Sequence, residues 1–305
     1  MSSGLRLLKR IPIPPGRSGD FDHGDVDPVT GRVFVAHTSE GTVDVIDGDT
    51  LEVMKVIEGC AEGSGVLCAP SRRLVLAAAR GAGQVLHINA DSLEIVGKTA
   101  VGPKPNGLAL DRGRGRVLVA DVDASDQRAR LVDLSTTQVA VDVELPGRPR
   151  WCVYDEASDA FMVNIREPAT VVSIAGSTGE IDSSWPISSA GPHGSDLDRE
   201  GGRLFVACDG GQLIAVDSRS GRELGGVPIS GVPDATWFNP TNQRVYVAVA
   251  NPGVIDVIDA GALRLIESIP TERGAKTTAI DIDRERLYVF LPESCSAEVF
   301  EAITS

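Results

Sequence analysis

Short runs of apolar residues, most of them opened by a basic residue, recur along the chain at a nearly constant interval. The runs are RVFVA (32–36), RLVLA (73–77), RVLVA (116–120), AFMVN (160–164), RLFVA (203–207), RVYVA (244–248) and RLYVF (286–290). Their first residues are separated by 41, 43, 44, 43, 41 and 42 positions. Self-similarity at a fixed period of this size is the sequence signature of a repeat architecture. The pattern therefore predicts seven copies of one structural unit.

Each unit contains three further stretches with the character of a strand. After each run comes a second apolar stretch, such as GTVDVID (41–47), and then a polar turn and an alternating stretch such as LEVMKVIE (51–58). Another short stretch, such as GLALD, precedes each run. Four short antiparallel strands joined by turns describe a propeller blade, and no long stretch has the 3.6-residue period of a helix. We therefore predict an all-β, seven-bladed propeller with four-stranded antiparallel blades.

The seventh unit, 275–305, lacks a fourth strand of its own. The stretch LRLLKRIPIP (5–14) closely matches LRLIESIP (263–270), which is the fourth strand of unit six. We expect residues 5–14 to complete the last blade, because this pairing leaves no sheet edge at the seam of the ring. The predicted organisation is one propeller domain over residues 1–305.

The repeated V-x-V-A after a basic residue, followed by V-x-V-I-D and a turn, resembles the YVTN-repeat, YncE-like β-propeller family. The resemblance covers almost the whole chain and implies the seven-bladed fold. Members of that family are used as binding modules, and several related seven-bladed propellers are enzymes, so the resemblance leaves function open. The family tends to be exported. The opening MSSGLRLLKRIPIPPG has no apolar core followed by a cleavage site, so we expect a cytoplasmic protein here.

Composition and charge narrow the classes of partner. The formal net charge of -14 provides no basic field for nucleic acid or for an anionic membrane surface. The five cysteines form no C-x-x-C pair, which favours reduced thiols buried as small apolar residues, with Cys60 and Cys208 the most exposed. We expect a monomer whose partner is a small anionic metabolite or another protein.

One position in each unit is chemically varied. The first strand of a propeller blade lines the central channel, so the residues ten positions before each run should form a ring at one mouth. They are Asp22, Gly63, Asn106, Arg150, His193, Asp234 and Lys276. A purely structural position would hold similar residues in every unit. Two readings remain: a ligand site made of a few convergent polar groups, or solvated turn residues at the starts of strands.

The acids and histidines of this ring have the chemistry of a metal site. Asp22, His23, His193 and Asp234 together offer the imidazole and carboxylate ligands that zinc, iron or manganese accept. A bound metal would turn water into a hydroxide nucleophile. Lys276 lies between the predicted acids, so an Asp–Lys ion-pair network is the alternative.

The cations of the ring favour an anionic ligand instead. Arg150 and Lys276 would hold a carboxylate or phosphate, with Asn106 as a polar neighbour and Trp151 as a stacking wall. His37 ends a strand near the same mouth. Two functions follow: a propeller that binds a small anion, a metal ion or a protein, or a cytoplasmic metal-dependent hydrolase or lyase of lactonase type. In the second, His193 or His23 acts as the catalytic base.

Overall fold

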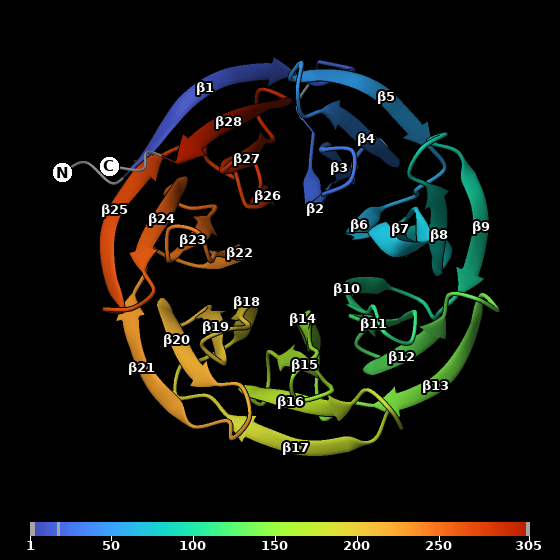
Figure 1. Ribbon diagram of the computed structural model, residues 1–305, viewed down its shortest axis with the longest axis vertical. Helices are drawn as coiled ribbons and strands as arrows, with labels where there is room; N and C mark the ends of the chain where they lie inside the picture. Colours follow the sequence, from blue (N-terminus) through green and yellow to red (C-terminus); the bar gives the residue numbers. More distant parts are fainter. Residues whose placement is uncertain (1–3, 17–18, 303–305) are drawn as a thin grey trace.

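Seven four-stranded antiparallel sheets stand around a central axis like the blades of a wheel (Figure 1). They are seen in a computed structural model that describes residues 4–16 and 19–302. The helices within these ranges are two three-residue 3₁₀ turns, η1 (Pro70–Arg72) and η2 (Arg80–Ala82). No helix there is long and apolar enough to cross a membrane. The predicted all-β, seven-bladed propeller is confirmed.

The second strand of each blade is a nearly continuous apolar run, because neighbouring blades cover both of its faces. The innermost strands, which line the axis, are β2 (Phe21–Asp27), β6 (Gly63–Ala69), β10 (Pro105–Asp111), β14 (Pro149–Asp155), β18 (Pro192–Asp198), β22 (Pro233–Asn239) and β26 (Thr277–Asp281). The second strands are β3 (Arg32–His37), β7 (Leu74–Ala79), β11 (Arg116–Asp121), β15 (Ala160–Ile165), β19 (Arg203–Cys208), β23 (Arg244–Val249) and β27 (Arg286–Leu291).

The outer two strands carry the chain from the core to the rim. The third strands are β4 (Thr42–Asp47), β8 (Gln84–Asn89), β12 (Arg128–Asp133), β16 (Thr170–Ala175), β20 (Gln212–Asp217), β24 (Val254–Asp259) and β28 (Ser296–Ala302). The outermost strands are β5 (Glu52–Glu58), β9 (Ile95–Ala100), β13 (Gln138–Glu144), β17 (Ile181–Pro186), β21 (Glu223–Pro228), β25 (Arg264–Pro270) and β1 (Leu5–Pro12). These outermost strands are mostly exposed, so the rim of the ring is polar.

The first strand of the chain closes the ring. β1 pairs with β28 in an antiparallel register that joins Leu5 to Ala302 and Ile11 to Ala297. The side chain of Ile11 is buried, and the pairing leaves β28 with a neighbour on both edges. The predicted completion of the last blade by the N-terminal stretch is therefore confirmed; residues 303–305 of that blade lie outside the described ranges.

The pairing register corrects one position of the predicted ring. Phe21 pairs with His37 in blade one, and Gly63 pairs in the same way with Ala79 in blade two. Gly63 is therefore equivalent to Phe21, and Ser64 takes the place predicted for Gly63. The turn before the second strand has the same length in both blades, and Arg73, with φ 53°, takes the left-handed position that Gly31 holds in blade one. The second strand therefore begins at Leu74, one residue later than the run suggests.

The cysteines agree with the sequence analysis except at two positions. All five are buried, and no disulfide forms among the described residues. Cys60 and Cys208, which we expected to be the most exposed, are fully enclosed by blade packing. Burial raises the pKa of both thiols to about 12, so they serve as small apolar residues and not as nucleophiles.

Candidate functional site

A β-bulge at the start of the innermost strands places the predicted ring residues at one mouth of the channel. In blade one the register shifts between Phe21 and Gly24, which leaves Asp22 and His23 outside the regular ladder. A bulge re-aims side chains away from the sheet face. Asp22, Arg150 and His193 are accordingly half-buried between fully buried neighbours. The local fold thus presents Asp22, Arg150 and His193 at the mouth, whereas Ser64 is fully buried and bonds the backbone carbonyl of Pro105 at 2.8 Å.

His193 is held by a carboxylate from the adjacent loop. Its Nδ1 lies 2.8 Å from Oδ1 of Asp209, and its Nε2 lies 3.6 Å from Oδ1 of Asp234 in the next blade. Arg166 approaches the other Asp209 oxygen at 2.9 Å. Burial would raise the pKa of Asp209, but the hydrogen bond from His193 and the positive charges of His193, Arg166 and Arg150 hold it below its ordinary value. Asp209 therefore fixes the orientation of the imidazole, with Nε2 facing Asp234.

Asp22 and Asn106 are joined through a cation that the sequence analysis did not select. Arg80 donates one hydrogen bond to Oδ2 of Asp22 at 2.8 Å and another to Oδ1 of Asn106 at 2.6 Å. Burial would raise the pKa of Asp22, but the neighbouring imidazole of His23 and the positive charges of Arg80 and Lys276 together outweigh burial and lower it. Asp22 is therefore a charged residue that positions Arg80.

Lys276 takes part in an ion pair at the mouth. Its Nζ lies 3.3 Å from Oδ1 of Asp20. Burial would lower the pKa of Lys276, but the carboxylates of Asp20, Asp234 and Asp22 together raise it. The Asp–Lys network that we weighed as an alternative is present, with Asp20 as the contact partner.

Three aromatic rings from different blades meet inside the channel below the mouth. His23 stacks on Trp151 with ring centroids 4.1 Å apart, and Trp151 meets Trp237 edge to face at 6.1 Å. Burial lowers the pKa of His23, even though Asp22 and Asp234 favour its charged form. The imidazole of His23 is therefore neutral, as expected for a buried ring that stacks on the indole of Trp151. We call His23, Trp151 and Trp237 the aromatic plug.

The predicted metal ligands meet in pairs. His23 Nε2 lies 3.4 Å from Asp22 Oδ1, and His193 Nε2 lies 3.6 Å from Asp234 Oδ1. Within residues 4–16 and 19–302, no group of three or more His, Cys, Asp or Glu side chains could hold a metal ion. The metal site stays a prediction, without support from this geometry. The other two histidines, His37 and His87, are buried and bonded to Asp44 and Thr99.

A cleft next to the ring is lined by cations from blades two to four. Its volume is about 410 Å³, and its lining comprises Glu62, Arg80, Lys104, Val122, Asp123, Ala124 and Arg148.

Three charged residues of the mouth, Arg80, Arg166 and Asp209, are absent from the sequence prediction. They were missed because they follow a second strand and do not precede a first one. The signal was present in the sequence, since the residue directly after each second strand reaches the same mouth.

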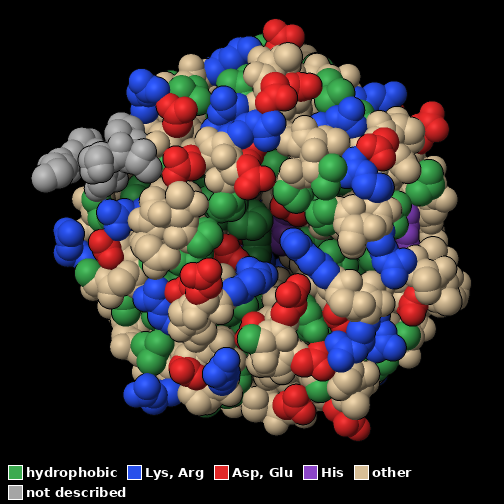
Figure 2. Space-filling view, viewed as in Figure 1, with side chains coloured by type: hydrophobic (Ala, Val, Ile, Leu, Met, Phe, Trp, Pro, Cys, Tyr) green, Lys and Arg blue, Asp and Glu red, His purple; other side chains and the backbone are tan. Residues whose placement is uncertain are grey.

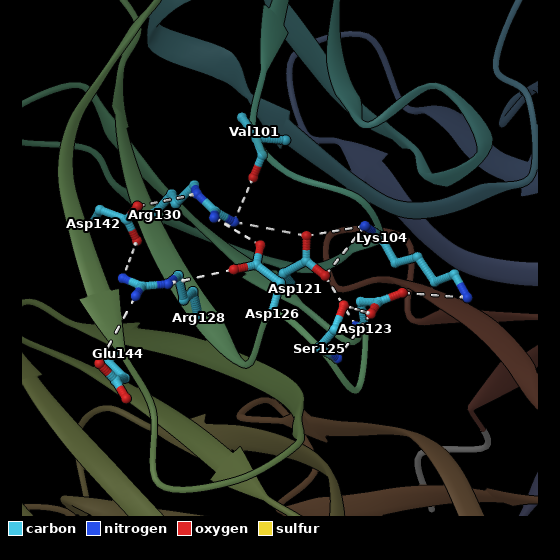
Figure 3. Close-up of polar contacts among 10 residues, drawn as sticks. All are labelled: Val101, Lys104, Asp121, Asp123, Ser125, Asp126, Arg128, Arg130, Asp142 and Glu144. Atoms are coloured by element: carbon cyan, nitrogen blue, oxygen red, sulfur yellow. Dashed lines mark hydrogen bonds and ion pairs between the residues drawn. The ribbon is translucent and has the colours of Figure 1, made fainter.

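One wall of this cleft is stiffened by an ion-pair network on blade three (Figure 3). Backbone N–H groups of Lys104 and Asp123 donate to the buried carboxylate of Asp121 at 3.0 and 2.9 Å. Arg130 lies 3.7 Å from the same carboxylate and binds Asp126 at 2.7 Å. The network fixes the loop that carries Lys104, so the cleft is preformed.

Two arginines at the mouth are outside the ion-pair networks of the described residues. Neither Arg148 nor Arg150 forms an ion pair within the described ranges. The Nε atoms of Arg80, Arg148 and Arg150 are buried without a hydrogen-bond partner in the same part of the chain. Burial and the like charge of Arg148 lower the pKa of Arg150, against the raising effect of the Asp234 and Asp209 carboxylates, which act from beyond ion-pair distance. The mouth therefore holds buried guanidinium donors that no described protein group accepts from.

Comparisons with known proteins agree with this architecture. No family model matches the chain. Uncharacterized protein YncE of Salmonella typhimurium is 28% identical over 103 residues, which is 33% of this chain and 29% of that protein. YncE of Salmonella typhi is 27% identical over the same length. The chain thus matches less than a third of the length of these curated relatives.

A solved structure extends the likeness to the whole ring. A chain of Kuenenia stuttgartiensis hydrazine synthase superposes with a TM-score of 0.85, covering 94% of this chain and 97% of that one. The sequence identity is 13%, so this likeness shows the fold alone. The fold is thus that of a seven-bladed propeller, and about a third of the sequence is similar to YncE.

Proposed function

We propose that this propeller binds a small anion, a metabolite with a carboxylate or phosphate group, at the channel mouth that holds Arg148 and Arg150. The observation that carries the proposal is the set of buried, unpartnered guanidinium Nε atoms at Arg80, Arg148 and Arg150. A buried donor without a partner is costly, and a planar guanidinium matches carboxylate and phosphate oxygens in a two-point contact. An anion at this mouth would neutralise the guanidinium groups of Arg148 and Arg150, which form no ion pair within the described ranges.

The remaining side chains of the mouth have supporting parts in this proposal. Asp22 and Asn106 hold Arg80 in place, so they position a donor and need not touch the ligand. Lys104 adds a third cation to the cleft, beside Arg80 and Arg148, although Asp123 lies 3.5 Å from it. The whole chain carries a net charge of -14. Selective attraction of an anion therefore depends on this local group of cations, since the overall field is repulsive.

Calorimetric titration tests the proposal. Inorganic phosphate and citrate are the probes, and glycerol is the neutral control. We expect heat of binding from at least one anion, and a loss of about tenfold or more in affinity in Arg150→Gln and Arg148→Gln, because a charge-assisted hydrogen bond contributes on the order of 1.5–3 kcal/mol. Arg219→Gln, an exposed turn residue, removes the same charge elsewhere and should bind as the parent does. Equal affinities in all variants would contradict the proposal.

A second function is favoured by the His193 geometry. An imidazole oriented by a carboxylate through Nδ1, with Nε2 directed into the mouth, is the arrangement of a general base. A hydrolase or lyase of lactonase type would use it to activate water beside the arginines. A panel of lactones and esters tests this function. Turnover that falls at least about a hundredfold in His193→Ala would support it, and turnover unchanged in that variant would exclude His193 as the base.

A further inference from the structure

A second hollow lies in the channel on the far side of the aromatic plug. Its volume is about 510 Å³, and all seven innermost strands line it. It runs from His23, Trp151 and Trp237 to a rim that includes Arg112 and Arg199. The space-filling view down the axis shows a central hollow with apolar side chains in its depth and charges of both signs around it (Figure 2). We call this space the channel cavity.

The walls of the channel cavity are mostly apolar. Most innermost strands have one partly exposed side chain in their second half. These side chains lie inside the ring and line the channel cavity. They are Asp25, Leu67, Leu110, Asp196, Trp237 and Ile280. Four are apolar. The carboxylates of Asp25 and Asp196 are the exceptions.

Asp25 and Asp196 occupy equivalent positions in blades one and five. Oδ1 of each accepts the N–H of the following residue at 2.8 Å. Oδ2 of Asp25 accepts the N–H of Cys68 in the next blade at 2.7 Å, and Oδ2 of Asp196 accepts that of Phe238 at 2.8 Å. Each carboxylate thus bridges two blades.

The propeller does not need these bridges to close. The register assigns apolar residues to the same position in the other five blades: Leu67, Ala109, Val153, Trp237 and Ala279. Five of the seven inter-blade contacts therefore form without a carboxylate. A structural role alone leaves unexplained why two acids stand in this apolar wall.

Neither acid has a cation in contact. Within the described ranges Asp25 and Asp196 form no ion pair. Burial raises the pKa of Asp25 to about 6, against the lowering effect of the Cys68 and Val26 N–H groups and of Arg112. Burial also raises the pKa of Asp196, against the charge of Arg199. Arg112 and Arg199 are thus the facing charges, and both act from beyond contact distance. Buried charges in proteins are normally paired.

We propose that the channel cavity binds an organic ammonium ion, a primary or secondary amine on an apolar or aromatic body. The ammonium donates hydrogen bonds to Asp25 or Asp196, and the apolar body packs on Leu67, Leu110 and Ile280. Trp237 offers the face of its indole to the cation, and its ring is fixed by a 3.0 Å hydrogen bond from Nε1 to Thr278. The volume suits a small organic ligand. A hydrated metal ion would leave the apolar walls unused.

Titration with phenethylamine tests this inference, with phenethyl alcohol and phenylacetate as neutral and anionic analogues of the same shape. We expect the amine to bind and the two analogues to bind at least about tenfold more weakly. Asp196→Asn and Asp25→Asn should each weaken amine binding by a similar factor. Equal binding of the alcohol, or no binding of the amine, would overturn the proposal. Heat from calcium or sodium chloride alone would also overturn it, in favour of an inorganic cation.

A separate variant keeps the test independent of the inter-blade bridges. Leu110→Trp narrows the channel cavity and changes no carboxylate, so amine binding should be lost while both bridges remain. Thermal unfolding verifies that each variant is folded. Arg150→Gln, which alters the opposite mouth, should bind the amine as the parent does. This last control separates the inference from the proposed anion site, since either can fail without the other.

Discussion

Individual arginines near the mouth differ in whether a carboxylate contacts them. Arg130 and Arg150 are both largely buried arginines, yet Arg130 contacts Asp121, Asp126 and Asp142, whereas Arg150 has no ion-pair partner in the described ranges. Breaking a buried ion pair lowers the free energy of unfolding, because it leaves one charge buried without a partner. Removing an unpaired buried charge removes its desolvation cost and does not lower that free energy. The two arginines should therefore respond to mutation in opposite ways.

Replacing each arginine by methionine measures this difference. Arg130→Met should lower the free energy of unfolding by about 3 kcal/mol, because it leaves buried carboxylates unpaired. Arg150→Met should leave stability unchanged or raise it in the absence of ligand. Urea unfolding monitored by tryptophan fluorescence gives both values. A loss at Arg150→Met as large as that at Arg130→Met would mean that Arg150 is satisfied within the protein.

The buried carboxylate of Asp25 should make stability depend on pH. Its pKa is raised to about 6 in the folded protein, against about 3.9 when unfolded. The folded state therefore takes up a proton first, and this residue adds stability as the pH falls from 7 towards 4. The free energy of unfolding of the parent, minus that of Asp25→Asn, should increase over this window by on the order of 2 kcal/mol. Urea unfolding curves of both proteins at pH 7 and pH 5 test the sign. A difference that is smaller at pH 5 than at pH 7 would contradict it.

At the scale of the strand, β1 holds the ring closed. It supplies a full edge partner for β28 and buries Ile11 and Ile13 against the last blade. Deleting residues 1–15 should expose the edge of β28, lower the unfolding temperature by more than about 10 °C and promote association through the open edge. Differential scanning calorimetry and light scattering measure both effects.

The matched control for that deletion changes only surface charge on β1. Arg6 and Arg10 pair with Glu301 and Glu298 at 2.6 and 2.5 Å, and both arginines are more than half exposed. Exposed pairs contribute about 0–1 kcal/mol each, so Arg6→Gln with Arg10→Gln should shift the unfolding temperature by a few degrees at most. A shift as large as that of the deletion would mean that the ion pairs, and not the strand pairing, close the ring.

The pattern of apolar positions predicted the strands well because each blade buries the same strand positions against its neighbours. The runs at 32–36 and 244–248 are second strands, and the match of 5–14 to 263–270 correctly identified the closing strand. The error at Gly63 came from a turn. Arg73 takes the left-handed turn position that Gly31 holds in blade one, and as a basic residue before an apolar run it imitates the first residue of the strand. Backbone conformation in turns is set by local geometry, which the alternation of strands does not encode.

At the scale of the whole molecule, two different candidate sites lie on either side of the aromatic plug. One mouth gathers Arg148 and Arg150, and the channel cavity holds Asp25 and Asp196; none of these four forms an ion pair within the described ranges. The sequence could predict the mouth, since Arg150 and His193 share one position in the repeat. It could not predict the channel cavity, because the acids there differ from their equivalents only when the register of all seven blades is known.

The anion that we propose between Arg148 and Arg150 can be observed directly. Crystals grown without phosphate or sulfate and soaked in selenate would locate it by anomalous scattering of selenium. We predict an anomalous peak within hydrogen-bond distance of both guanidinium groups in the parent and no peak there in Arg150→Gln. A parent crystal with no peak at this mouth, or with both arginines bound to carboxylates of the protein, would contradict it.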